Sequence, residues 1–404
     1  MKKSFIRGLG INIVLLGIAS FVTDVSSDMI QPILPLFIVA LGGAGLAVGL
    51  IGGLGDSIAG FLKIASGYLS DKTGRRKPLI IAGYGSSSVS KLFFSASSTW
   101  AHMLALRPVE RIGKGLRTAP RDAIIADSAP QKIRGKAFGL HRALDSAGAI
   151  LGSSIALVLY WFLGWDFPPI LLVAAVIAFL ALIPLAFVRE IRREPRPTTL
   201  SISLRALPGC LRFFIFIATL FALGNFTYMF FILKAWEVLP AGMAEIFVIL
   251  LYIWFNIVYT VFSVPSGMVS DKIGRKAVLF FGYALFGITC IAIILPSSLE
   301  LLIIVFALYG LVNALVEGTQ RALASDLVGS ELRGTALGTF HTAISLATLP
   351  AGIFAGLLWE YMDPVATFVY GAILALLSAI LLAFVRYPKT DISARKKTEE
   401  SSNV

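Results

Sequence analysis

The chain has 404 residues, of which 57% are hydrophobic and only 14% are charged. Because soluble proteins carry about 25% charged residues, this composition excludes an ordinary water-soluble protein and favours one that is embedded in a lipid bilayer. The net charge of +12 would also fit a nucleic-acid-binding protein. The Lys and Arg residues cluster at the ends of apolar runs, however, so we expect no nucleic-acid partner.

Twelve apolar stretches are long enough to cross a bilayer, which takes about 20 helical residues. We therefore predict an all-α integral membrane protein with twelve transmembrane helices. The first stretch lacks a small-residue cleavage site, so we expect it to be retained rather than removed as a signal peptide. The stretches lie at residues 11–41, 46–70, 78–98, 101–127, 133–163, 168–188, 211–239, 243–270, 277–296, 300–326, 332–361 and 364–386.

The connecting turns predict how the chain is oriented. Lys and Arg occupy alternate turns, at residues 72–77, 132–136, 272–276 and 333, whereas the other turns hold only Asp166 and Asp363. Since basic residues mark the cytoplasmic side, these turns and both termini should be cytoplasmic. We expect a multi-pass protein of the cytoplasmic membrane.

A charged turn occurs twice. GYLSDKTGRRK at residues 67–77 returns as GMVSDKIGRK at residues 267–276, and further echoes follow at offsets of 197–200 residues. The repeat predicts two pseudo-symmetric bundles of six helices, residues 1–188 and 211–386, with a substrate path between them. We expect residues 189–210 to be a cytoplasmic linker and residues 387–404 to be a disordered tail.

Both copies of this turn resemble the signature G-x-x-x-D-x-x-G-[RK]-[RK] of the major facilitator superfamily. The resemblance extends over nearly the whole chain and implies a transporter that alternates between two conformations. In each half, we expect the Arg of the turn to pair with a carboxylate at the end of the fourth helix and so form a latch. The latch residues are Gly67, Asp71, Arg75 and Asp127, and then Gly267, Asp271, Arg275 and Asp326.

The fourth stretch is unusually ionic for a membrane span. Its basic residues recur every three or four positions, so they should share one face of a helix. Arg111-x-x-x-Gly115 resembles a second motif of the superfamily, in which the Arg is linked to proton coupling, although Arg117 departs from that pattern. Ions within the membrane are costly, so each should face a cavity or a partner.

The fifth stretch carries glycines at residues 139, 148 and 152, a spacing that resembles the antiporter motif of drug-efflux members. The match is partial, since Ser153 replaces the Pro of the motif. Close helix packing is an alternative role for these glycines. His141 and Asp145 are four residues apart and should touch, either as a proton-handling pair or as a structural one.

Acidic residues inside the first two stretches suggest a proton site. Asp24 and Asp28 are the first choices, because loss of water favours the protonated form of a carboxyl group. Protonation would then release a neighbouring cation, Arg111 or Lys91. The full set of proton-coupling candidates is Asp24, Asp28, Asp56, Glu110 and Arg111.

Polar positions shared by the two halves indicate a common cavity. Asn225 and Asn256 fall where the repeat places Asp24 and Asp56. The alternative for many of these residues is an internal salt bridge without contact to a ligand. The cavity candidates are Lys91, Lys114, Arg117, Arg142, Asp145, Asn225, Tyr228, Asn256, Asn313, Glu317 and Gln320.

Two functions remain open at this point. One is proton-coupled efflux of a small organic solute. The other is symport or exchange of an anionic metabolite, which is favoured by the basic residues on one face of the fourth stretch. We expect no enzyme, metal or cofactor, because no nucleophile–base set, metal-ligand spacing or Walker-type nucleotide motif is evident. The expected partners are a small-molecule substrate, protons and the bilayer, with a proton gradient as energy source and the chain acting as a monomer.

Overall fold

The computed structural model describes residues 10–129, 133–190, 204, 207–295, 298–328 and 332–385. Within these ranges the regular structure is entirely α-helical apart from short turns. Most of the predicted linker, residues 191–203 and 205–206, lies outside the described residues. The predicted disordered tail at residues 387–404 also lies outside them.

The first half consists of helices that coincide with the first six predicted spans. The first span is interrupted at residues 31–33, where Pro32 and Pro35 prevent one continuous helix. The sixth is divided in the same way near Ala181. The helices are α2 (Ile11–Ile30), α3 (Leu34–Ala40), α4 (Gly45–Thr73), α5 (Lys77–Phe94), α6 (Trp100–Ser128), α7 (Arg134–Trp161), α8 (Phe167–Leu180) and α9 (Leu182–Phe187).

The second half repeats this arrangement, with a non-helical break at residues 225–228 in its first span. Ten helical segments of the described chain are long and apolar enough to cross a membrane, and α5 and α6 are not among them. An all-helical membrane fold is therefore confirmed, while twelve transmembrane helices and a cytoplasmic placement of the termini stay predictions. The helices are α10 (Gly209–Gly224), α11 (Met229–Val238), α12 (Ala244–Ile273), α13 (Arg275–Ala292), α14 (Leu299–Asp326), α15 (Arg333–Tyr361) and α16 (Pro364–Ala383).

The two copies of the repeated turn end long helices at a glycine. Gly74 ends α4 with φ of 65°, and Gly274 ends α12 with φ of 96°. Side chains other than glycine are strained in this region of backbone conformation. Just beyond, Lys77 Nζ donates to the carbonyls of Ala186 and Val188 at 2.8 and 2.7 Å. Lys276 does the same for Ala383 and Val385 in the second half.

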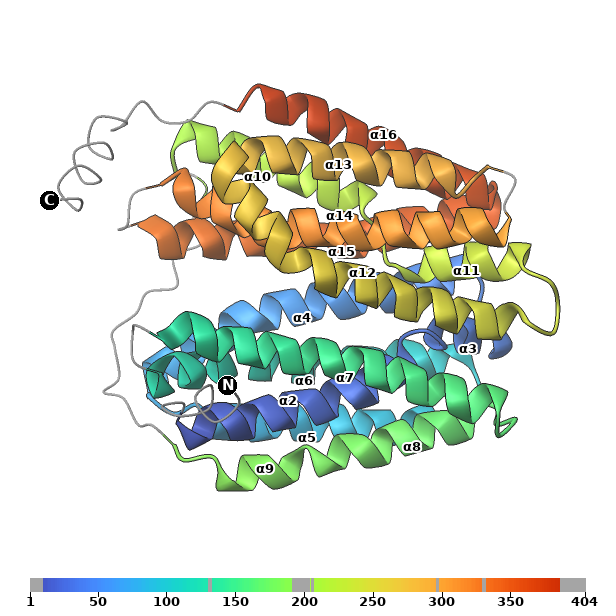
Figure 1. Ribbon diagram of the computed structural model, residues 1–404, viewed down its shortest axis with the longest axis horizontal. Helices are drawn as coiled ribbons and strands as arrows, with labels where there is room; N and C mark the ends of the chain where they lie inside the picture. The colour runs from blue at the N-terminus through green and yellow to red at the C-terminus, as the bar shows by residue number, and fades with distance from the viewer. Residues whose placement is uncertain are drawn as a thin grey trace, which may run out of the picture.

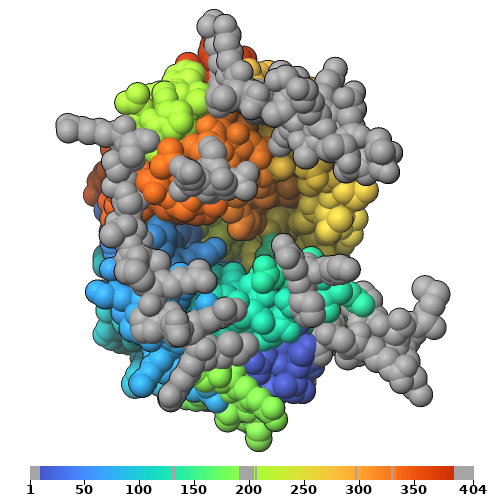
Figure 2. Space-filling model, turned by 90° about the vertical axis from the view of Figure 1, so that its left-hand side faces the viewer, coloured from blue at the N-terminus to red at the C-terminus, as the bar shows by residue number. Residues whose placement is uncertain are grey.

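Helices α2–α9 form one bundle and helices α10–α16 form another (Figures 1 and 2). The bundles meet chiefly where α4 packs on α15 and α7 packs on α12, and α11 adds contacts with α3 and α4. We call the end of the molecule that carries the turns at Gly74 and Gly274 the basic end, which lies at the left of Figure 1. The opposite end is closed by the packing of α4 on α15.

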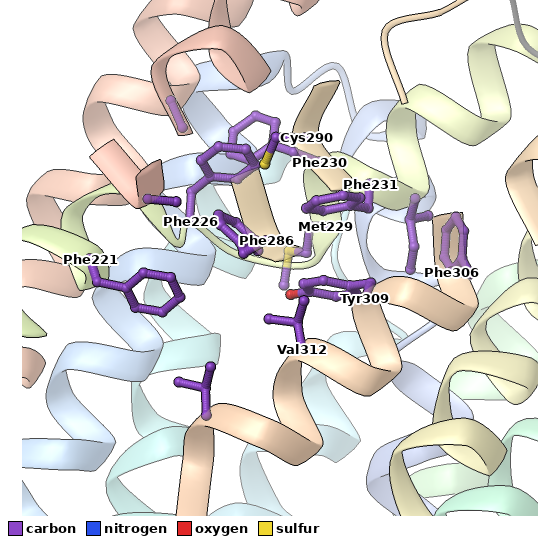
Figure 3. Close-up of a cluster of buried hydrophobic side chains, with 14 of the residues drawn as sticks. Phe221, Phe226, Met229, Phe230, Phe231, Phe286, Cys290, Phe306, Tyr309 and Val312 are labelled. Carbon is purple, nitrogen blue, oxygen red and sulfur yellow. The ribbon is translucent and has the colours of Figure 1, made fainter. Parts of the chain in front are cut away.

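The interior of the second bundle is aromatic. Phe226, Phe231 and Phe286 lie together (Figure 3), and the rings of Phe231 and Tyr309 stack with centroids 4.4 Å apart. Phe221 stacks on Tyr283 at 4.0 Å. Such offset pairs add to the apolar burial that holds the helices together. The interior of the first bundle is different, because it holds most of the buried charges described below.

The outer surface of both bundles is apolar. Large hydrophobic side chains such as Phe162, Phe187, Val264 and Phe384 are about two-thirds exposed or more. An apolar belt of this kind suits contact with lipid, in which helices must satisfy their backbone groups internally. The composition and the surface thus agree on a multi-pass membrane protein.

Candidate transport pathway

A cavity of about 640 Å³ lies between the two bundles. Helices α2, α4, α6 and α7 line it from one side, and α12 and α14 line it from the other. It is reached from the basic end, where Figure 2 shows a hollow between the blue-green half and the orange-yellow half. This arrangement fits a binding site that is open to one side of a membrane and closed to the other.

The structure brings together many of the predicted cavity residues, but it does so in three groups. Asp56, Asn225 and Tyr228 line a separate, smaller cavity of about 210 Å³. The cavity candidates Lys91 and Gln320 line neither cavity, and neither do the proton-coupling candidates Glu110 and Arg111. The residues that do line the main cavity are Asp24, Asp28, Lys114, Arg117, Arg142, Asp145, Asn256, Asn313 and Glu317.

Asp24 and Asp28 lie on the cavity wall formed by α2. Asp28 Oδ1 accepts a hydrogen bond of 2.8 Å from the Tyr252 hydroxyl of the other bundle. Among the described residues, neither carboxylate has a cationic nitrogen within 4.0 Å. Helix α7 approaches closely here, since Cβ atoms at Gly148 and Gly152 would lie 2.6 and 2.1 Å from α2 carbonyl oxygens. Gly148 and Gly152 therefore allow close helix packing, which was the alternative to a role in an antiporter motif.

The expected cation partners of these carboxylates are engaged elsewhere. Lys91 Nζ donates to the hydroxyls of Ser26 and Ser27 at 3.0 and 2.8 Å, and its side chain is fully buried. Arg111 lies 3.6 Å from Asp56 and 3.5 Å from Glu110. The expectation that protonation of Asp24 or Asp28 directly frees Arg111 or Lys91 is thus wrong, because neither contacts the two carboxylates.

Glu110 is the centre of a buried ion cluster between α6 and its neighbours. Its Oε2 lies 3.1 Å from Arg107 Nη1, and both side chains are at most 3% exposed. Arg107 Nη2 in turn donates to Gln31 Oε1 at 3.1 Å. The face of α6 toward the bundle interior thus carries a structural salt bridge, whereas Lys114 and Arg117 lie on the cavity.

A second ionic group joins the two bundles nearer the basic end of the cavity wall. Arg142 on α7 donates to the Tyr259 hydroxyl, which donates to Glu317 on α14. Glu317 also accepts from Arg321 at 3.0 Å and lies 3.9 Å from Arg142. Side chains of Arg142 and Glu317 are about half exposed, so the contact can break without burying an uncompensated charge.

The latch at the basic end is present in both halves, with one correction. Arg76, not Arg75, pairs with Asp127, and it lies 3.8 Å from Asp71. In the second half Arg275 pairs with Asp326 and lies 3.4 Å from Asp271, as expected. Arg76 replaces Arg75 in this pairing because the first half has one extra residue between Gly74 and α5. Arg76 therefore takes the place that Arg275 has directly after Gly274.

Two further details describe the surroundings of the turns. The carboxylate of Glu190 lies at the start of α5 and accepts from the backbone N–H groups of Arg76 and Lys77 at 3.0 and 2.9 Å. A carboxylate is favoured at a helix N-terminus. A Cβ on Gly67 would touch Ala119 at 3.3 Å, as close packing requires, but one on Gly267 would meet nothing within 4 Å.

The corrected latch gives a direct test with a matched control. We expect Arg76→Ala to lower the free energy of unfolding by about 1.5–3 kcal/mol, because it removes a largely buried charged hydrogen bond to Asp127. Arg75→Ala should change it by less than about 0.5 kcal/mol, since the Arg75 side chain is exposed. Unfolding curves of the purified variants in detergent measure both effects. An equal loss in the two variants would contradict the assignment of Arg76.

Sequence reasoning missed the polar residues through which the bundles touch. Gln31 accepts hydrogen bonds from the Tyr228 hydroxyl at its carbonyl oxygen, 3.1 Å away, and at its side chain. Tyr252 and Tyr259 also cross between the halves. Tyr252 and Tyr259 could have been predicted from the sequence, because they are four and three residues from Asn256 and therefore share its face of α12.

Comparison with known proteins agrees with this architecture. The family model of the Major Facilitator Superfamily matches residues 16–236 and 214–403. An uncharacterized MFS-type transporter of Methanocaldococcus jannaschii is 47% identical over 386 residues, which are 94% of this chain and 96% of that protein. The chain therefore belongs to the major facilitator superfamily of transporters, and it is not an enzyme.

More distant relatives include a solved structure and a curated protein. The solved structure of the nucleoside transporter NupG has a TM-score of 0.76 at 16% identity, and the match covers 93% of this chain and 100% of that one. At this identity the similarity shows the fold alone. The multidrug resistance protein MdtH of Photorhabdus laumondii is 26% identical over 77% of each chain.

Proposed function

We propose that this transporter is a proton-coupled antiporter that exports a small organic solute from the cytoplasm by alternating access. One observation carries the proposal. Asp24 and Asp28 line the central cavity one helical turn apart, and within the described residues no cation pairs with either. Carboxylates that are partly removed from water and not neutralised by a cation are suited to bind and release protons.

The hydrogen bond between Asp28 and Tyr252 supplies a way to couple the proton to the conformation. It connects the two bundles, with the carboxylate on α2 and the donor on α12. A charged acceptor forms a stronger hydrogen bond than a neutral one, so protonation of Asp28 weakens a contact between the halves. The balance between the two conformations then shifts with proton binding.

The charged turns and a relative support export as the direction of transport. The basic end, onto which the cavity opens, is cytoplasmic by the positive-inside rule. The relative named as a multidrug resistance protein and the partial antiporter motif both favour export. A solute would enter the cavity from the cytoplasm and leave after the halves rearrange.

Inverted membrane vesicles containing the transporter provide the test. Respiration acidifies their interior and quenches acridine orange, and a proton antiporter restores the fluorescence when its substrate is added. We expect ethidium or tetraphenylphosphonium to restore it with the parent protein. Asp28→Asn should remove the response while the protein stays folded, and Asp122→Asn, a cavity carboxylate paired with Arg121 at 3.0 Å, should keep it. A full response in Asp28→Asn would contradict the proposal.

A second function is favoured by a different observation. Lys63, Lys114 and Arg117 line the cavity without a carboxylate within ion-pair distance among the described residues. Arg117 stacks 4.4 Å from the Tyr84 ring, and its buried Nη1 has no hydrogen-bond partner in this part of the chain. These cations would suit an anionic solute. A response in the vesicle assay to benzoate, and not to the cations, would favour this alternative.

A further inference from the structure

The smaller cavity of about 210 Å³ forms a chamber of its own beside the main cavity. It lies at the break between α10 and α11, where residues 225–228 are not helical. Asn225, Thr227 and Tyr228 face it from this break, and Asp56 on α4, Tyr309 on α14 and Thr348 on α15 complete the wall. Interrupted helices at the interface of two halves commonly form solute sites in transporters of this architecture.

A hydrogen-bonded partition separates the chamber from the main cavity. Gln31 lines the main cavity and Tyr228 lines the chamber, and the Tyr228 hydroxyl donates to Gln31. The two residues belong to different bundles. A solute that passes from one cavity to the other must part them, which requires the bundles to shift or the tyrosine to turn.

Two polar groups of the chamber, on Asp56 and Thr227, can still accept hydrogen bonds from a ligand. Asp56 forms an ion pair with Arg111 at 3.6 Å, which is too long for a good hydrogen bond, and its side chain is 45% exposed, so its carboxylate oxygens can still accept hydrogen bonds from a ligand. The Thr227 hydroxyl oxygen is buried and has no hydrogen-bond partner among the described residues. An unsatisfied buried hydroxyl costs free energy unless a ligand or water completes it.

These features define the chemistry of an occupant. A carboxylate attracts a cation, and the rings of Tyr228 and Tyr309 add faces over which cations are favoured. The volume admits a compact group rather than a whole drug-sized molecule, because drug-sized ligands need about 300 Å³ or more. We propose that the chamber binds the ammonium group of an amine-bearing solute, with Asp56 as its counter-ion and Thr227 as a hydrogen-bond acceptor.

This inference rests on the proposed transport of a small solute between the bundles, and it specifies one chemical group of that solute. It does not depend on proton coupling. The inference is also compatible with Lys63 and Lys114 of the main cavity, which have no ion-pair partner among the described residues. A solute with an amine at one end and an acidic group at the other would match both cavities.

Cysteine labelling tests the chamber directly. The chain has two cysteines, Cys210 and Cys290, so a background without them is accessible by two replacements. In that background Thr227→Cys reports on the chamber, and Ser263→Cys, on the wall of the main cavity, is the matched control. The purified protein in detergent is treated with 2-aminoethyl methanethiosulfonate, which carries an ammonium group, or with its 2-sulfonatoethyl analogue. Rates are divided by those of 2-mercaptoethanol.

We expect the ammonium reagent to react at least about tenfold faster than the sulfonate at Thr227→Cys, which corresponds to about 1.4 kcal/mol of preference. Adding Asp56→Asn should reduce this ratio severalfold there and leave it unchanged at Ser263→Cys. Adding Tyr228→Phe, which removes the partition's hydrogen bond, should speed both reagents at Thr227→Cys.

Three outcomes would each overturn the inference. They are equal rates for the two reagents at Thr227→Cys, a ratio of ammonium to sulfonate rates that Asp56→Asn does not change, and no reaction even when Tyr228→Phe is added. Circular dichroism and size-exclusion profiles confirm that each variant is folded. Labelling needs no proton gradient. A negative result here therefore leaves the proton-antiport proposal intact, and loss of proton antiport leaves this result intact.

Discussion

Gly49→Ala is expected to abolish most of the transport activity while leaving each bundle folded. A Cβ at Gly49 would lie 2.0 Å from the carbonyl oxygen of Gly352, and a Cβ at Gly352 would lie 2.2 Å from that of Gly49. The obstacle on each side is backbone, which cannot turn away as a side chain can. Helices α4 and α15 belong to different bundles, so the clash opposes the conformation that is closed at the end opposite the basic end.

Overpacking of this kind costs about 1–3 kcal/mol. Because the penalty applies to only one of the two conformations, it changes the ratio of their populations by about 5- to 150-fold. Solute uptake or efflux in cells should fall accordingly, and cysteine reactivity at the closed end should rise. Gly85→Ala in α5 is the control, because a Cβ there would meet nothing within 4 Å. Normal transport by Gly49→Ala would show that close contact of α4 and α15 is not needed.

The second large effect is expected at Glu110. Glu110→Gln keeps the shape of the side chain but leaves the buried guanidinium groups of Arg107 and Arg111 without their shared carboxylate. Removing one partner from a buried ionic group costs about 3–5 kcal/mol, since the remaining charge is not solvated. Most of the folded protein should be lost on purification, or its melting temperature should fall by many degrees.

A more exposed pair on the wall of the main cavity provides the comparison. Asp122→Asn breaks the contact with Arg121, but the Asp122 side chain is 38% exposed, so the expected loss is at most about 1 kcal/mol. Thermal unfolding of both variants in the same detergent separates the two cases. A melting temperature of Glu110→Gln equal to that of Asp122→Asn would contradict a structural role for the buried cluster.

The sequence was sufficient to predict the helices, because apolar runs of membrane length and their breaks are local properties. Pro32 and Pro35 marked the interruption after α2, and the repeated turn indicated two bundles. The true latch residue could also have been found. The repeat offset is 200 residues at Gly74 and 199 at Tyr84, so an inserted residue had to lie between them, which aligns Arg76 with Arg275.

The division of the polar residues among three environments could not be predicted in the same way. Arg107, Arg111 and Lys114 recur every three or four residues and therefore lie on one face of α6. One flank of that face meets α2 and α4, and the other flank meets the cavity. Lys91 was assigned to the cavity because a buried lysine is costly. Two serines on α2, which no local pattern connects to it, satisfy it instead.

Spin-label distances across both ends of the molecule test the central claim, that protonation at Asp24 and Asp28 drives the exchange of the two conformations. In the cysteine-free background, labels at Gly135 and Ile273 span the basic end, and labels at Ala44 and Tyr361 span the opposite end. Between pH 5.5 and 8.5, we expect the two distances to change in opposite directions, and we expect Asp24→Asn with Asp28→Asn to remove both changes. Unchanged distances in the parent protein, or changes that persist in the double variant, would contradict it.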